Sequence, residues 1–151
     1  MSDINVLYVD DELENLNSFK ACFRRDFNVI LSSSALEARS ILESTDIHVL
    51  VTDQRMPGTT GVVLLSESVK LYPNVSRILL TGYADFEALV EAINIGRIFK
   101  YLEKPWDEEK LKSCILEAHK ICLLKRDKDL FIKKLKLTNT ELELSLKNIN
   151  P

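Results

Sequence analysis

The sequence contains few residues that cross-link or interrupt a chain: its 151 residues include three cysteines, four glycines and four prolines. Cys114 and Cys122 lie eight residues apart in one predicted helix, and the resulting separation of about 12 Å excludes a disulfide between them. No apolar run approaches the ~20 residues of a membrane-spanning helix, and the first residues do not open a signal peptide. We therefore expect a cytoplasmic protein without a membrane segment.

The sequence also lacks an excess of positive charge, since 20 Lys and Arg stand against 23 Asp and Glu. Direct binding to nucleic acid or to an anionic membrane needs a basic field, so neither is an expected partner. Residues 1–105 hold 10 basic and 15 acidic residues, whereas 106–151 hold 10 basic and 8 acidic residues. Residues 106–150 contain neither glycine nor proline, which indicates a long helix after a compact acidic domain.

Short apolar runs alternate with helical patterns along the first 105 residues. This alternation is typical of repeated βα units that form a parallel sheet with helices on both faces. The predicted strands are residues 4–9, 27–31, 47–52, 75–81 and 98–102. In such a sheet ligands bind at the carboxyl ends of the strands, near the point where the strand order reverses.

Five polar residues stand at these strand ends: Asp10, Asp11, Asp53, Thr81 and Lys104. Three converging carboxylates need a counter-charge, and Mg²⁺ prefers such oxygen ligands. A lysine and a threonine hydroxyl neutralise or donate to phosphoryl oxygens, and an aspartate can itself act as the nucleophile. The pattern therefore predicts a Mg²⁺-assisted phosphoryl acceptor.

Four motifs with their order and spacing resemble the receiver domain of two-component response regulators. They are Tyr8-Val9-Asp10-Asp11-Glu12, Val51-Thr52-Asp53-Gln54-Arg55-Met56-Pro57-Gly58, Leu79-Leu80-Thr81-Gly82-Tyr83 and Tyr101-Leu102-Glu103-Lys104-Pro105-Trp106. The resemblance covers about residues 3–123. It implies an α/β, doubly wound, five-stranded parallel sheet of the flavodoxin and CheY type, in the order 2-1-3-4-5, followed by an extended C-terminal helix.

The resemblance assigns Asp53 as the residue that becomes an aspartyl phosphate, with a sensor histidine kinase as phosphoryl donor. It implies that Asp11, Asp53 and the backbone carbonyl of Arg55 ligate Mg²⁺, and that Asp10 supports the ion through water. Arg55 and Tyr83 occupy positions that vary in the family and tune the phosphoryl lifetime. Because both side chains are bulky, we expect slow self-dephosphorylation.

The same resemblance assigns Lys104 to the phosphoryl oxygens, next to a cis bond to Pro105. Thr81 and Tyr101 would form the switch: the hydroxyl turns toward the phosphate and the ring turns inward behind it. A half-buried tyrosine that merely packs against the last helix is the alternative for Tyr101. The surface of the fourth helix, fifth strand and fifth helix would report the phosphorylation state.

The last helix is predicted to run from residue 107 to about 148, which divides the chain into a receiver domain (1–123) and a helical extension (124–151). Positions spaced four and three apart form a mostly apolar stripe with one asparagine, an arrangement typical of a parallel coiled-coil dimer. A frayed linker helix and a helix packed back on the receiver are the alternatives. Basic residues between 125 and 136 are interleaved with acidic ones, which indicates a solvated face. The residues of the predicted dimer stripe are Ile121, Ile132, Leu135, Asn139, Leu142 and Leu146.

Such a helix suits a signalling arm, so we expect the chain to be a fragment whose output domain is absent. Its motifs resemble receivers joined to cyclic-dinucleotide phosphodiesterases or cyclases, or to hydrogenase-type transcriptional regulators. No enzymatic activity beyond self-phosphorylation and self-dephosphorylation is expected.

Three other functions compete with this one. A Mg²⁺-dependent phosphatase with an aspartyl nucleophile needs an acid/base carboxylate two residues after the nucleophile, where this chain has Arg55, and a cap domain. A flavin-binding carrier needs a hydroxyl- and glycine-rich loop after the first strand, where this chain has acidic residues. An unphosphorylated structural adaptor remains the third alternative.

The three cysteines, Cys22, Cys114 and Cys122, show no metal-binding spacing, and we expect them to be small buried hydrophobic residues. His48 lies in an apolar strand, and we predict a core or edge histidine with satisfied hydrogen bonds. His119 lies on the last helix, where we expect it to be solvated.

Overall fold

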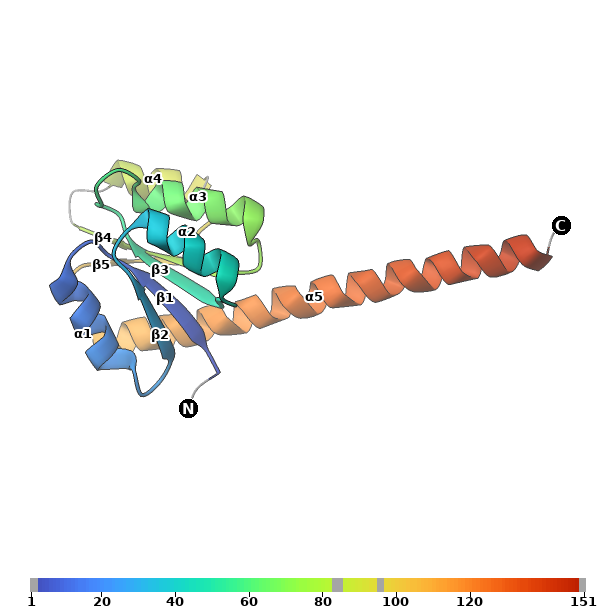
Figure 1. Cartoon of the computed structure of the whole chain (residues 1–151), viewed down its shortest axis with the longest axis horizontal. Coiled ribbons are helices and arrows are strands. Elements are labelled where there is room, and N and C mark those ends of the chain that lie inside the picture. The colour runs from blue at the N-terminus through green and yellow to red at the C-terminus, as the bar shows by residue number, and fades with distance from the viewer. Residues whose placement is uncertain (1–2, 83–85, 95–96, 150–151) are drawn as a thin grey trace.

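The computed structural model describes residues 3–82, 86–94 and 97–149 (Figure 1). Five parallel strands form one sheet in the order β2-β1-β3-β4-β5, which confirms the predicted fold class. The strands are β1 (Asn5–Val9), β2 (Asn28–Ser32), β3 (Val49–Asp53), β4 (Ser76–Thr81) and β5 (Lys100–Glu103). The helices are α1 (Leu13–Phe23), α2 (Ala35–Ser44), α3 (Gly61–Leu71), α4 (Phe86–Asn94) and α5 (Glu108–Ile149).

The two faces of the sheet form two separate hydrophobic clusters, because successive strand residues point to opposite sides. Val6 and Tyr8 of β1 point toward α1 and α5, where they pack with Phe19 and Ile115. Leu7 belongs to the opposite cluster, under α2 and α3. Figure 1 shows α1 and α5 on one side of the sheet and α2, α3 and α4 on the other.

Local signals place the helices that follow the strands. The Ser34 hydroxyl accepts a hydrogen bond from the Glu37 amide and begins α2, as an N-cap serine does. Thr60 caps α3 in the same way. Gly61 follows it so closely behind β3 that an added Cβ would overlap the carbonyl oxygen of Asp53. Only glycine therefore allows α3 to begin directly against the end of β3.

All five strands begin one or two residues later than predicted, at Asn5, Asn28, Val49, Ser76 and Lys100. Each predicted range covers a run of apolar residues, and only the later part of that run pairs with a neighbouring strand. Ile47, for example, is buried although it precedes β3. Asp53 is itself the last residue of β3, paired with Leu80, rather than the first residue after it.

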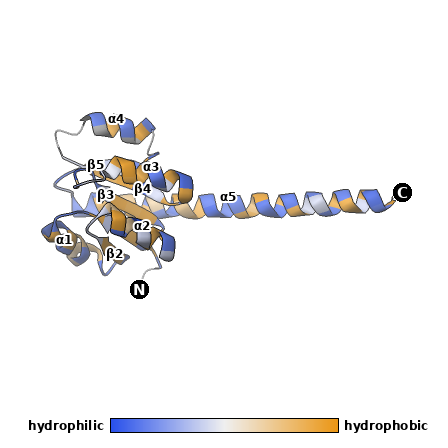
Figure 2. Ribbon diagram, turned by 45° about the horizontal axis from the view of Figure 1, so that its top comes forward, coloured by the Kyte–Doolittle hydropathy of each residue, from blue (hydrophilic) through white to orange (hydrophobic). Residues whose placement is uncertain are grey.

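Helix α5 has 42 residues and a length of about 63 Å. Its buried residues end at Cys122, and we call the sheet with α1–α4 and α5 up to this residue the body. Polar contacts with the body continue slightly further: Arg126 forms a two-pronged ion pair with Asp46, and Asn74 donates to Asp129 at 2.7 Å. From there to Ile149 the helix is exposed and projects away from the body, so it does not pack back on it (Figures 1 and 2).

The two histidines, His48 just before β3 and His119 on α5, are in contact. His48 is buried, and its Nδ1 accepts the Asn5 amide hydrogen at 3.0 Å, as expected for a satisfied histidine. The prediction of a solvated His119 is wrong: its ring is half-buried and lies edge-on against His48, with centroids 5.0 Å apart. Among the described residues, no helix combines the length and apolar character needed to cross a membrane.

Candidate functional site

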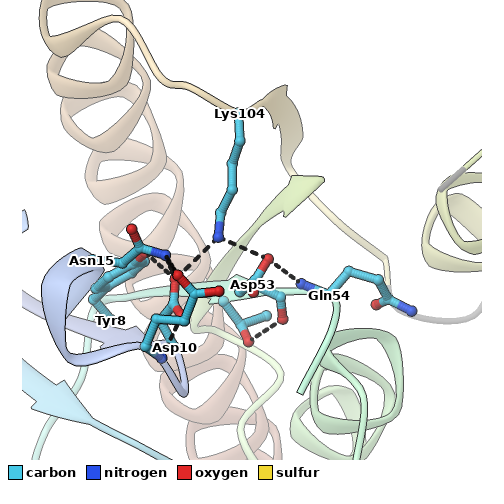
Figure 3. Close-up of polar contacts among 8 residues, drawn as sticks. Tyr8, Asp10, Asn15, Asp53, Gln54 and Lys104 are labelled. Carbon is cyan, nitrogen blue, oxygen red and sulfur yellow. Dashed lines mark hydrogen bonds and ion pairs between the residues drawn. The ribbon is translucent and has the colours of Figure 1, made fainter. Parts of the chain in front are cut away.

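Asp10 follows β1 directly, and its carboxylate is fully buried. Its Oδ2 accepts hydrogen bonds from the Tyr8 hydroxyl at 2.6 Å and from the Asn15 amide at 3.0 Å, while Oδ1 accepts the Glu12 amide hydrogen (Figure 3). Burial alone would raise the pKa of Asp10, but the hydrogen bonds from Tyr8 and Glu12 and the Lys104 ammonium outweigh it and lower the pKa. Asp10 is therefore a fixed negative charge.

Lys104 joins two carboxylates at the carboxyl edge of the sheet. Its Nζ lies 3.1 Å from Asp10 Oδ2 and 3.1 Å from Asp53 Oδ1 (Figure 3). The Lys104 amide donates to the carbonyl of Thr81 at 2.8 Å, and the following bond to Pro105 is cis. Although burial opposes the charge, the two carboxylates raise the pKa of Lys104, so the side chain is a cation.

Asp53 is the second partner of this lysine. Its Oδ1 accepts the amide hydrogen of Gln54 at 2.9 Å and pairs with Lys104. Its Oδ2 has no hydrogen-bond partner within the described ranges. Burial and the negative charge of Asp10 raise the pKa of Asp53 despite the lysine. A further cation beside Asp53 would therefore stabilise its ionised form. Its Oδ2 is available for such a contact or for a reaction, since it has no partner among the described residues.

The acidic cluster fits a hard cation. Asp10, Asp11 and Asp53 each offer a carboxylate oxygen, and these oxygens all lie within 4.8 Å of one another. Since the oxygens of Asp10 already accept four donors, Asp11 and Asp53 are the carboxylates best able to bind the ion directly. Carboxylates of this kind, together with water, are what Mg²⁺ prefers.

Gln54 is the first residue of the loop after β3, and it also binds the end of that loop at the start of α3. The sequence patterns did not identify this role. The Gln54 carbonyl accepts the Gly61 amide hydrogen at 3.0 Å, and its side-chain oxygen accepts that of Val62 at 2.9 Å. Arg55, next in the chain, is exposed. Tyr8 and Asn15 were missed as well; the signal for Tyr8 is a phenol at an inward-facing strand position two residues before a carboxylate.

The proposed switch residues lie on neighbouring strands. Thr81 ends β4 and is buried, one residue beyond the Leu80 that pairs with Asp53. Tyr101 of β5 is 43% exposed, so its ring is outside the core in this structure. Tyr83 lies outside the described residues. The predicted dimer residues do not belong to this site: Ile121 is half-buried at the body, and the others lie on the exposed part of α5.

Comparison with known proteins gives a consistent result for this region. A family model described as the response regulator receiver domain matches residues 6–116. The hydrogenase transcriptional regulatory protein HoxA of Cupriavidus necator is 38% identical over 120 residues, which cover 78% of this chain and 25% of that protein. HoxA of Bradyrhizobium diazoefficiens is 31% identical over 122 residues, or 81% of this chain and 25% of that protein. The chain thus spans about a quarter of the length of the curated relatives it matches.

Solved structures resemble the fold just described. An adenylate cyclase from Rhodopirellula baltica matches with a TM-score of 0.83 and 31% identity, over 88% of this chain and 99% of that one. A CheY-like response regulator receiver domain protein from Methanospirillum hungatei matches with a TM-score of 0.76 and 28% identity, over 82% of this chain and 99% of that one. The region matched by the family model contains Asp10, Asp53 and Lys104.

Proposed function

Because the chain belongs to the receiver domain family of two-component response regulators, we propose that Asp53 accepts a phosphoryl group from a phosphohistidine of a sensor histidine kinase. One observation carries this proposal: the Lys104 ammonium lies 3.1 Å from both Asp10 and Asp53, while the Oδ2 of Asp53 has no partner among the described residues. The lysine neutralises charge without occupying the nucleophile.

In the proposed transfer, the free oxygen of Asp53 attacks phosphorus, and a new O–P bond forms as the P–N bond to histidine breaks. The electron pair of that bond returns to the imidazole, and the product is an acyl phosphate. Lys104 neutralises a phosphoryl oxygen, and the Thr81 hydroxyl donates to another. Asp10 holds the lysine in place from the other side.

The acidic cluster is proposed to hold Mg²⁺ through Asp11, Asp53 and the backbone carbonyl of Arg55, with Asp10 acting through water. When bound, the ion supplies positive charge that offsets the repulsion between the carboxylates and an incoming phosphoryl group. The chain itself contributes the position of the carboxylate oxygens. The pairing of β1 with β3 brings them together at the ends of these strands without a bound ligand.

Transmission is proposed to pass from Thr81 to Tyr101 and then to α5. New charge on Asp53 would draw the hydroxyl of Thr81 toward it, and the exposed ring of Tyr101 would move inward behind it. Receiver (1–123) and extension (124–151) are the proposed units, and the first six residues of the extension still contact the body through Arg126 and Asp129.

The extension is proposed to form a parallel two-stranded coiled coil that leads to an output domain. Ile132 at one core position, Leu135 at the next and Asn139 one heptad after Ile132 follow the pattern that favours parallel dimers. The relatives are transcriptional regulators of which the chain spans only a quarter, which supports an output domain in the longer protein. The residues of the proposed core are Ile132, Leu135, Asn139, Leu142 and Leu146.

Intact-mass spectrometry after incubation with Mg²⁺ and acetyl phosphate tests the phospho-acceptor. We expect the chain to gain one phosphoryl group, the Asp53→Asn variant to gain none and the Asp46→Asn variant to gain one. Asp46 is a matched control because it lies at the opposite end of β3, paired with Arg126. Phosphorylation of Asp53→Asn would overturn the assignment, and sustained turnover of para-nitrophenyl phosphate would favour the phosphatase.

A further inference from the structure

Helix α5 carries a second apolar stripe besides the proposed dimer core. Five leucines recur at intervals of seven residues, and every one is exposed, from 40% to 66%. Figure 2 shows hydrophobic segments recurring along the projecting helix among hydrophilic ones. We call these residues the leucine stripe: Leu116, Leu123, Leu130, Leu137 and Leu144.

The leucine stripe lies on the opposite side of the helix from the dimer core. At 3.6 residues per turn, Leu137 is about 140° from Ile132 and about 160° from Leu135 around the helix axis. A two-stranded coiled coil that buries Ile132 and Leu135 therefore leaves Leu137 in water. An apolar stripe that remains exposed over four heptads, or about eight helical turns, indicates a separate binding surface.

The stripe also begins on the body itself. Lys112 of α5 pairs with Asp26 after α1 at 3.1 Å, and Leu116 lies one turn further along the same side of the helix. Leu116 thus belongs to the body and Leu123 directly follows its last residue, whereas Leu130, Leu137 and Leu144 lie on the projecting part of α5. A single helix docked on the stripe would contact both parts.

Charges beside the stripe decide what it can bind. In a parallel, in-register pair of identical helices the leucines fill only one of the two core positions of each heptad, and a core residue meets its own copy. The other core position would hold either the residues in line with Lys133, so that Lys133 faces Lys133, or those in line with Lys134, so that Lys134 faces Lys134. Neither lysine has an ion-pair partner in the described part of the chain. Like charges at such positions destabilise a coiled coil, so a second copy in this arrangement is disfavoured. The flanking residues are His119, Arg126, Lys133, Thr140 and Lys147 on one side, and Lys120, Asp127, Lys134 and Glu141 on the other.

We propose that the leucine stripe binds an amphipathic helix of a partner protein, in which a heptad stripe of apolar residues is flanked by Asp and Glu. The apolar residues would cover the five leucines, and the acidic flanks would pair with the lysines that have no partner. This surface is distinct from the phosphorylation site and does not depend on it.

Two designed peptides, each about four heptads long, test the proposal on the full chain. Both carry the same leucine stripe, one flanked by glutamates and the other by lysines. Fluorescence anisotropy of the labelled peptides should show saturable binding of the glutamate peptide, and binding of the lysine peptide weaker by at least about tenfold. The difference should shrink at high salt, because the flanking charges are exposed.

Variants locate the binding surface. The double variant Leu130→Gln/Leu137→Gln should weaken binding of the glutamate peptide at least about tenfold, since it removes two leucines of the stripe. The matched variant Leu135→Gln/Leu142→Gln, which changes the dimer core instead, should leave this binding within about twofold. Glutamine is a good helix former and all four positions are exposed, so helicity by circular dichroism should be unchanged.

Four results would overturn the proposal. They are no binding of the glutamate peptide, equal binding of both peptides, loss of binding only in the dimer-core variant, or monomer formation in the Leu130→Gln/Leu137→Gln variant by sedimentation velocity. The last result would identify a second copy as the occupant. Flotation with phosphatidylglycerol vesicles, if abolished in the stripe variant while neither peptide binds, would identify a membrane surface instead.

Discussion

Gly61 decides how closely α3 approaches the residue that we assign as phospho-acceptor. A methyl group at this position would overlap the Asp53 carbonyl and lie 3.0 Å from the Cα of Gln54. We expect Gly61→Ala to lower the free energy of unfolding by about 2 kcal/mol, as overpacking does. Phosphorylation by acetyl phosphate should slow as well, because the end of β3 must shift. Urea unfolding and a mass-spectrometric time course measure the two effects.

Gly58 supplies the matched control for that substitution. It has a φ of +79°, but nothing lies within 4 Å of an added Cβ. Gly58→Ala should therefore cost about 1 kcal/mol of backbone strain without a steric shift of β3. A Gly61→Ala variant as stable as the wild-type chain would contradict the packing argument.

Tyr8 holds the buried Asp10 in its ionised, hydrogen-bonded state through a 2.6 Å hydrogen bond. Tyr8→Phe removes the donor and leaves the ring stack on Phe19 intact. We expect a loss of about 1.5 kcal/mol in urea unfolding, the scale of a hydrogen bond to a charged group. Tyr101→Phe, at an exposed tyrosine of β5, should be close to neutral. If both variants unfold at the same urea concentration, Tyr8 has no such role.

Residues at the site differ in how far the sequence reveals them. Asp10, Asp53 and Lys104 stand at strand ends, and the rule for parallel sheets brings them together without further information. Tyr8 and Gln54 act through contacts that depend on the direction of a side chain in the folded core. A strand pattern identifies Tyr8 as buried but does not tell which polar atom its hydroxyl reaches.

At the scale of elements, the boundary of the body along α5 is testable. The family model ends at residue 116, yet Ala118 and Cys122 are buried and the carbonyl of Ala118 accepts the Ser76 hydroxyl at 2.6 Å. A chain of residues 1–130 should unfold at the same urea concentration as the full chain, because every buried residue of α5 is kept. A chain of residues 1–116 should lose at least about 3 kcal/mol, as removal of buried side chains does. Equal stability of the two truncated chains would contradict the assigned boundary.

The contact between α5 and the start of β3 should make stability depend on pH. Burial, Arg126 and His119 lower the pKa of His48, while Asp46 and Asp3 oppose them. Because the folded chain binds this proton less readily than the unfolded chain, the stabilisation is complete above about pH 6.5. It is lost as the pH falls toward the lowered pKa.

The urea midpoint should therefore fall between about pH 7.5 and 5.5, and fall less in the His48→Gln variant. The variant should keep part of the slope, since burial lowers the pKa of His119 as well. Identical slopes for both proteins would show that His48 is not responsible.

Sequence patterns predicted the elements better than their ends. Helix α3 has ends that local signals mark, since Thr60 caps its start and Pro73 follows its end. The strands at Asn28 and Val49 began later than predicted, because the apolar run reports burial whereas the strand depends on pairing with its neighbours. The edge-on contact of the histidines depends on where α5 crosses the sheet, which no local pattern specifies.

On the scale of the whole molecule, the proposed phosphorylation site and the extension lie at opposite ends of the sheet. Asp53 and Lys104 stand at the carboxyl edge, whereas α5 leaves the body beside Asp46, before β3 begins. A signal from one to the other must cross the length of the sheet. Helix α5 is suited to this task because one continuous element packs on β3 and β4 and then forms the projecting arm.

Native mass spectrometry before and after treatment with Mg²⁺ and acetyl phosphate tests the central claim most directly, because it reads phosphoryl content and oligomeric state in one spectrum. We expect one phosphoryl group per chain on Asp53, none in Asp53→Asn, and a larger share of dimer in the phosphorylated sample than in the untreated one. A chain that remains unmodified, or that is modified while Asp53→Asn is modified equally, would contradict the account.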